Sequence, residues 1–92
     1  MKLPTFDEFR VQTLALGFDE VLERRWAPGT VLDEHTHSFQ ANALVTHGEV
    51  WLIDGTKERR LVPGDRFHLR PNMSHAERYG SEGDAYWVAR RN

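Results

Sequence analysis

The chain has 92 residues, 39% of them hydrophobic, and this length supports one domain with one core, because two smaller cores would each bury too little apolar surface. Its 12 Lys and Arg and 14 Asp and Glu residues are interspersed and give a formal net charge of −2. This balance argues against nucleic acid as a partner. The absence of cysteine excludes disulfides, thiolate metal sites and a cysteine nucleophile, and leaves His, carboxylate or amide ligands for any metal.

The beginning of the chain carries no apolar targeting segment, and no stretch approaches the roughly 20 apolar residues of a membrane span. We therefore expect a soluble, cytoplasmic protein with no membrane partner.

Thr5 and Glu8 form the pattern of a capping box, in which each side chain bonds the other residue's backbone N–H at the start of a helix. The helix is expected to end at Gly17, since glycine takes the left-handed backbone conformation at a helix end at little steric cost. It is amphipathic but short, so it needs a larger partner. We expect residues 1–17 to be a helical segment that packs on a barrel formed by residues 18–92.

From Phe18 onward, short runs rich in Val, Leu, Trp and Phe are each closed by Gly, Pro or Asp, which is typical of an antiparallel sandwich or barrel. Asp54-Gly55 is the strongest hairpin signal. Val50 to Ile53 are apolar on both faces, which indicates a strand covered on both sides by the helix or by a second subunit. The expected strands are 18–26, 30–37, 41–46, 49–53, 57–62, 66–70, 75–79 and 85–90.

Three of the five histidines are candidate metal ligands. His35 and His37 lie two apart in a strand-like run, so their side chains are expected on the same face and within reach of one ion. His75 follows a turn, strand and turn that can return beside this pair. The alternative for an isolated pair is that both rings face water. We predict that His47, in an expected turn before Gly48, and His68 face solvent and have no role in the site.

These residues resemble the motifs of the cupin superfamily. Gly29, His35-Thr36-His37 and Gly48 match the first motif, which reads Gly, five residues, His-x-His, three or four residues, Glu, six residues and Gly. Pro63-Gly64-Asp65 and His75 match the second motif and its preceding turn. The two motifs span residues 29–75. The resemblance implies an all-β fold: a single antiparallel, jelly-roll-like cupin β-barrel, preceded here by the short N-terminal helix.

The chain departs from these motifs at several positions. Ala41 stands where the family has a Glu ligand, and we predict that a bulge or a shifted turn brings the Gln40 amide oxygen to the metal instead. In the second motif Pro71 is one position late and Met73 stands where Gly is expected. Tyr79 replaces the closing Asn.

Glu77 lies two residues after His75 and is therefore expected on the same face of the strand. It has three open roles: metal ligand, carboxylate that orients an imidazole, or exposed salt-bridge partner. Glu77 is also the first candidate for a general acid or base. Tyr79 is a further candidate, whereas Glu34 is expected to point away from His35.

The resemblance implies one divalent transition metal (Fe, Ni, Mn, Cu or Zn) held by His35, His37, Gln40 and His75, with open positions for chemistry. The expected ligand or substrate is a small organic molecule, and dioxygenase or isomerase chemistry is compatible with such a centre. The alternatives are a non-catalytic binding or sensor protein and a metal-free structural role. Four aromatic residues either line an apolar cavity or form core: Phe39, Trp51, Phe67 and Trp87. Small cupins pair through sheet edges, so a homodimer is expected.

Overall fold

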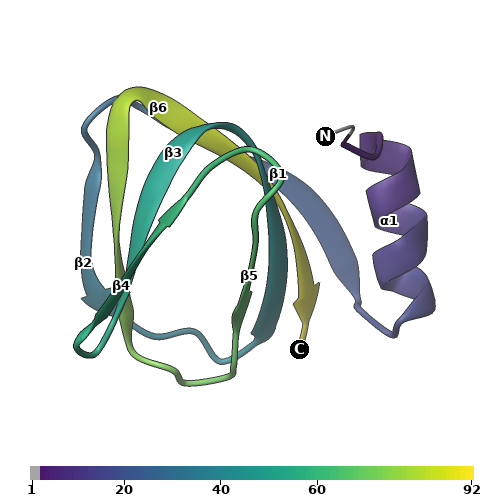
Figure 1. Ribbon diagram of the computed structural model, residues 1–92. Helices are drawn as coiled ribbons and strands as arrows, with labels where there is room; N and C mark the ends of the chain where they lie inside the picture. The colour runs from purple at the N-terminus through teal and green to yellow at the C-terminus, as the bar shows by residue number, and fades with distance from the viewer. Residues whose placement is uncertain (1–2) are drawn as a thin grey trace.

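The computed structural model describes residues 3–92 as one helix and six strands (Figure 1). All strand pairs are antiparallel and belong to one sheet in the order β1-β6-β3-β4, with β2 also beside β6 and β5 beside β3. The predicted all-β, antiparallel barrel with a preceding helix is confirmed. The elements are α1 (Phe6–Ala15), β1 (Glu20–Trp26), β2 (Val31–His35), β3 (Gln40–Asp54), β4 (Lys57–Leu61), β5 (Arg66–Leu69) and β6 (His75–Arg91).

Two long strands, β3 and β6, run through both halves of the barrel. The first half of β3 and the last half of β6 pair with each other and are flanked by β5 and β1. The second half of β3 and the first half of β6 pair in turn and are flanked by β4 and β2. Each long strand was expected as two strands (41–46 and 49–53, then 75–79 and 85–90), and this prediction was wrong.

Glycines at the bends explain that difference. Register shifts interrupt the β3–β6 pairing on either side of residues 47 and 48, and Gly48 there has a φ of 71°. A Cβ on Gly48 would lie 2.1 Å from the carbonyl oxygen of Gly83 on β6. Gly48 therefore allows two paired strands to bend together at close approach, whereas the sequence pattern indicated a turn that ends the strand.

Helix α1 begins with the predicted capping box: the Glu8 N–H donates to Thr5 Oγ1, and the Thr5 N–H donates to Glu8 Oε1. Phe9 is completely buried and packs against the Trp87 ring at a centroid distance of 5.8 Å. This contact belongs to a small core of Phe9, Phe18, Leu44 and Ala89. The helix thus covers the outer face of β1, β3 and β6.

The main core fills the barrel interior and contains alternate residues of β3, among them Ala43, Val45, Val50 and Leu52. The predicted Asp54-Gly55 hairpin is confirmed, since it joins β3 to β4. Trp51 faces outward and is covered by the Arg78 guanidinium, 4.7 Å from its ring centroid. No helix in residues 3–92 has the length and apolarity required to cross a membrane.

Candidate metal centre

His35, His37 and His75 converge at one end of the barrel. His35 ends β2, His75 begins β6, and the two residues are cross-strand partners. His37 follows in the loop after β2, and its carbonyl accepts from the backbone N–H of Asn72 at 2.6 Å. One ligand nitrogen from each ring lies within 4.8 Å of those of the other two. The predicted convergence of three imidazoles is therefore present in the structure.

Backbone carbonyls orient two of these rings. His35 Nδ1 lies 2.7 Å from the Asp33 carbonyl oxygen, and His75 Nδ1 lies 3.0 Å from that of Met73. Because a carbonyl can only accept, Nδ1 of each ring carries a proton, and in the neutral ring Nε2 then carries the lone pair. His75 Nε2 is buried and has no hydrogen-bond partner among the described residues. A buried acceptor without a donor is costly, and a metal ion at this position would satisfy it.

His37 is half-buried and stacks on the Phe39 ring at 4.7 Å. Burial lowers the pKa of His37 to about 4, and positive charge on His75, His35, Arg90 and Arg24 contributes in the same direction. The ring is therefore neutral at physiological pH. A neutral imidazole is the form that binds a metal.

Glu77 lies in the interior beside the histidines, with only 5% of its surface exposed. Its Oε2 is 3.9 Å from His35 Nε2. Burial raises the pKa of Glu77, and the neighbouring His75 and His35 partly offset this effect. Of the three roles left open by the sequence, that of an exposed salt-bridge partner is wrong because the carboxyl is buried. The groups that bond Nδ1 of His35 and His75 are the backbone carbonyls described above, and not the Glu77 carboxyl.

A cavity of about 90 Å³ lies beside this cluster, with His35 and His37 among its lining residues. Its apolar wall includes Phe39 and Phe67, for which the sequence left cavity lining and core packing open, together with Ala41, Leu69 and Val88. Trp51 and Trp87 do not line the cavity. Their side chains lie on the outer face of the sheet, where Arg78 covers Trp51 and helix α1 covers Trp87. Two of the four aromatic residues considered in the sequence therefore line the cavity, and the other two do not.

Gln40 does not approach the histidines. Its amide Nε2 lies 2.8 Å from His68 Nε2, on the exposed side of β3 and β5. The predicted bulge is absent here, since residues 40–42 of β3 pair in regular register with Arg91, Arg90 and Ala89 of β6. Regular alternation turns Ala41 into the cavity and Gln40 away from it. The geometry therefore gives no support to Gln40 as a ligand.

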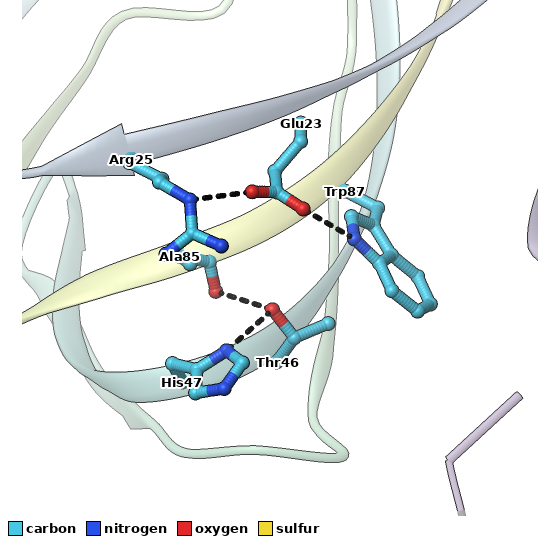
Figure 2. A network of polar contacts seen from close by, with 6 residues as sticks. All are labelled: Glu23, Arg25, Thr46, His47, Ala85 and Trp87. Atoms are coloured by element: carbon cyan, nitrogen blue, oxygen red, sulfur yellow. Dashed lines mark hydrogen bonds and ion pairs between the residues drawn. The ribbon is translucent and has the colours of Figure 1, made fainter. Parts of the chain in front are cut away.

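The other polar residues singled out in the sequence lie outside the cavity. His47 is exposed beside Thr46 on the outer side of the bend (Figure 2), and His68 is exposed on β5. Glu34 points outward and accepts a hydrogen bond from Ser74. Tyr79 is buried but stacks on Trp26, and burial raises the pKa of its hydroxyl far above the usual range.

The turn before His75 explains the irregular second motif. Asn72 has a φ of 63°, the only positive value at a non-glycine residue in the described chain. Asparagine tolerates this conformation better than other side chains. Counted from Gly64, position 72 is where the family motif has its second Gly. Asn72 therefore occupies the position of the motif's Gly, one residue before Met73, which was expected there from the position of Pro71.

Comparisons of the sequence with models of protein families and with curated proteins gave no match. Solved structures do match. KdgF from Halomonas sp. matches with a TM-score of 0.67 and 19% identity over 78% of this chain and 68% of its own. The DMSP lyase DddQ from Ruegeria pomeroyi matches with a TM-score of 0.67 and 25% identity, and a sugar phosphate isomerase from a cupin superfamily, from Silicibacter pomeroyi, with 0.64 and 21%.

The chain has the cupin fold. The last two matches each cover 78% of this chain but only 36% and 49% of the matched proteins, so this cupin domain spans half or less of their length. The different activities named for these proteins show that the fold itself does not determine the reaction.

The cupin barrel also places two residues in the cavity that the sequence analysis did not identify. Arg24 of β1 and Arg90 of β6 line it together with Trp26 and Tyr86. No local motif marks these arginines. They reach the cavity through strand register, which sets Arg24 opposite Tyr86 and Arg90 opposite Ala41.

Proposed function

We propose that this chain is a metal-binding small cupin that holds one divalent transition-metal ion on His35, His37 and His75 and acts on a small organic molecule. The observation that carries the proposal is the buried, unpartnered Nε2 of His75 beside two further imidazoles whose ligand atoms lie within 4.8 Å. The donor set is all nitrogen, which suits Fe, Ni, Cu or Zn, and Mn stays among the candidates.

The chain's own residues provide positioning and a proton-transfer group. The Asp33 and Met73 carbonyls hold the rings of His35 and His75 in the tautomer that presents Nε2. Glu77, buried at the cavity wall, can take or give a proton at a carboxyl oxygen. When bound, a metal would polarise an oxygen of the substrate or lower the pKa of a water. A proton-transfer reaction, such as an isomerisation, makes use of both features.

A dioxygenase reaction stays within the proposal, because three protein ligands leave open positions on an ion. The second candidate is a non-catalytic binding or sensor cupin. Ala41 favours it, since this residue contributes only a methyl group to the cavity wall where the family motif has a carboxylate. In either case the ligand is small, because a cavity of about 90 Å³ is well below the roughly 300–1,000 Å³ of drug-sized sites.

Elemental analysis of untagged protein tests the metal site. We expect about one transition-metal ion per chain in the wild type and almost none in His35→Ala, His37→Ala and His75→Ala. His47→Ala and His68→Ala are matched controls, since both rings are exposed and lie away from the cavity, and they should keep the ion. A wild type that holds no metal and cannot be loaded with Fe, Ni, Mn, Cu or Zn would overturn the proposal.

Replacement of Glu77 separates catalysis from metal binding. We expect Glu77→Gln to keep the ion, because the three imidazoles are sufficient ligands, and to lower the turnover of a substrate by roughly 10²-fold or more, as is usual for loss of a general acid or base. Gln40→Ala should change neither metal content nor turnover. Loss of the ion in Glu77→Gln would instead make Glu77 a ligand.

The expected homodimer stays a prediction. Strands β1, β5, β2 and β4 each have one side without a partner among the described residues, and a second copy could pair there. Light scattering of the purified protein gives the mass directly: twice 10.7 kDa supports the dimer, and 10.7 kDa contradicts it.

A further inference from the structure

The cavity beside the histidines carries more positive than negative charge. Two guanidinium groups, from Arg24 and Arg90, line it, and Glu77 is the one carboxylate among its lining residues. A divalent ion on the imidazoles would add further positive charge.

The two arginines have little to neutralise them within the protein. No carboxylate in residues 3–92 lies within ion-pair distance of Arg24. Arg90 meets Glu20 at 3.5 Å, but the Glu20 side chain is 49% exposed, and such a pair contributes little. Arg90 Nε is buried and has no hydrogen-bond partner within residues 3–92. The other arginines that form ion pairs, Arg25, Arg60 and Arg78, have side chains that are at least half exposed.

Packing alone explains only part of this arrangement. Arg24 lies 5.2 Å from the Trp26 ring centroid and Arg90 lies 4.5 Å from that of Phe39. These contacts stabilise the flat faces of the guanidinium groups and leave their N–H edges for an acceptor. An arginine needed only for packing could have been replaced by an apolar residue of similar size, with no buried donor left unpaired.

We propose that Arg24 and Arg90 bind the carboxylate or phosphate group of a small anionic molecule, and hold the rest of that molecule against the three histidines. The fork of N–H groups on each guanidinium matches the paired oxygens of such an anion. This inference names the ligand class of the proposed function and rests on that function for the chemistry. Binding of the anion itself does not require the metal.

The test uses metal-free protein and two small anions, propionate and ethyl phosphate, with propionamide as the neutral counterpart of propionate. Titrations are followed by the arginine Nε–Hε signals in ¹H–¹⁵N spectra. We expect at least one anion to shift the Arg24 and Arg90 signals in a saturable way, with roughly tenfold or greater preference for propionate over propionamide if the carboxylate is the recognised group. Saturation by ethyl phosphate alone would assign the site to phosphate.

Variants localise the effect. Arg24→Gln and Arg90→Gln should each weaken anion binding roughly tenfold while metal content stays that of the wild type. Arg25→Gln is the matched control: Arg25 is the next residue of β1, its side chain is 71% exposed, and it bonds Glu23 on the outer face (Figure 2). This variant should bind the anion normally.

The outcomes separate the two proposals. If neither anion shifts the Arg24 and Arg90 signals, or if Arg25→Gln weakens binding as much as the cavity variants do, the anion site is wrong, whatever the metal content. If the anion binds as expected but no metal can be loaded, the anion site stands and the proposed metal-dependent function fails.

Discussion

The two faces of the sheet formed by β1, β6 and β3 differ in composition and in how completely their polar atoms are paired. The outer face, under α1, is apolar around Phe9, Leu44 and Ala89. The inner face contains buried polar atoms without partners in the described chain, among them Trp26 Nε1, His75 Nε2 and both carboxyl oxygens of Asp84. Buried polar atoms without partners reduce stability, so this cost of polar burial is concentrated on the inner face.

The largest effect on stability is expected from the outer face. Phe9→Ala should lower the free energy of unfolding by about 3–5 kcal/mol, because it removes a fully buried ring that holds the helix on the sheet. Urea denaturation measures the change, and Phe9→Leu should lose much less. The exposed Val11 of the same helix is the control, with an expected change below about 0.5 kcal/mol on substitution by Ala. Equal losses at both positions would contradict the role of this face.

The inner face should respond to pH through Asp84. Burial, followed by the negative charge of Glu77, raises the pKa of Asp84 to about 7. An unfolded Asp titrates near 3.9, so between about pH 4 and 7 the unfolded chain has released a proton that the folded chain keeps. The stabilising protonated state is present below pH 4, and stability falls as pH rises through 7.

Asp84→Asn removes this titration because the amide resembles the protonated acid. We expect the variant to equal the wild type near pH 4 and to exceed it by roughly 2–4 kcal/mol at pH 8. Urea midpoints at the two pH values measure the difference, and Asp54→Asn in the exposed β3–β4 turn is the control. A constant difference across this range would show that Asp84 does not titrate there.

A smaller effect is expected at the start of the helix. Thr5→Ala should lower the free energy of unfolding by about 1 kcal/mol, since it removes the oxygen that accepts from the Glu8 N–H. Thr5→Ser keeps this oxygen and should retain most of the stability. Thermal unfolding followed by circular dichroism measures the stability of both variants. Identical curves for Thr5→Ala and the wild type would show that the Thr5 cap does not contribute to stability.

Features fixed by neighbouring residues were predictable from the sequence. The capping box at Thr5 and the hairpin at Asp54-Gly55 depend on spacings of one to three residues. His35 and His37 lie close together as predicted, but His37 lies in the loop after β2 and not on the same strand face. The bends at Gly48 and in residues 80–83 were read as turns, because a glycine that permits close approach of two strands has the same local pattern as a glycine that ends one.

The remaining parts of the site depend on pairing between distant strands. Arg90 reaches the cavity because β6 sets it opposite Ala41, and Gln40 turns away because that register has no bulge. The sequence around Arg90 and Gln40 contains no local pattern that indicates this strand register. Trp87 illustrates the same limit: it is apolar and lies in a strand, but only the position of α1 determines that it packs on the outer face.

The most direct measurement of the metal centre is a long-range ¹H–¹⁵N spectrum of the five imidazoles during titration of metal-free protein with Zn²⁺. We predict that His35 and His75 carry the proton on Nδ1 before titration, and that Nε2 of both rings and one nitrogen of His37 shift together and saturate at one equivalent. His47 and His68 should not change. Shifts confined to those two exposed histidines, or no saturation at one equivalent, would contradict a metal centre at this end of the barrel.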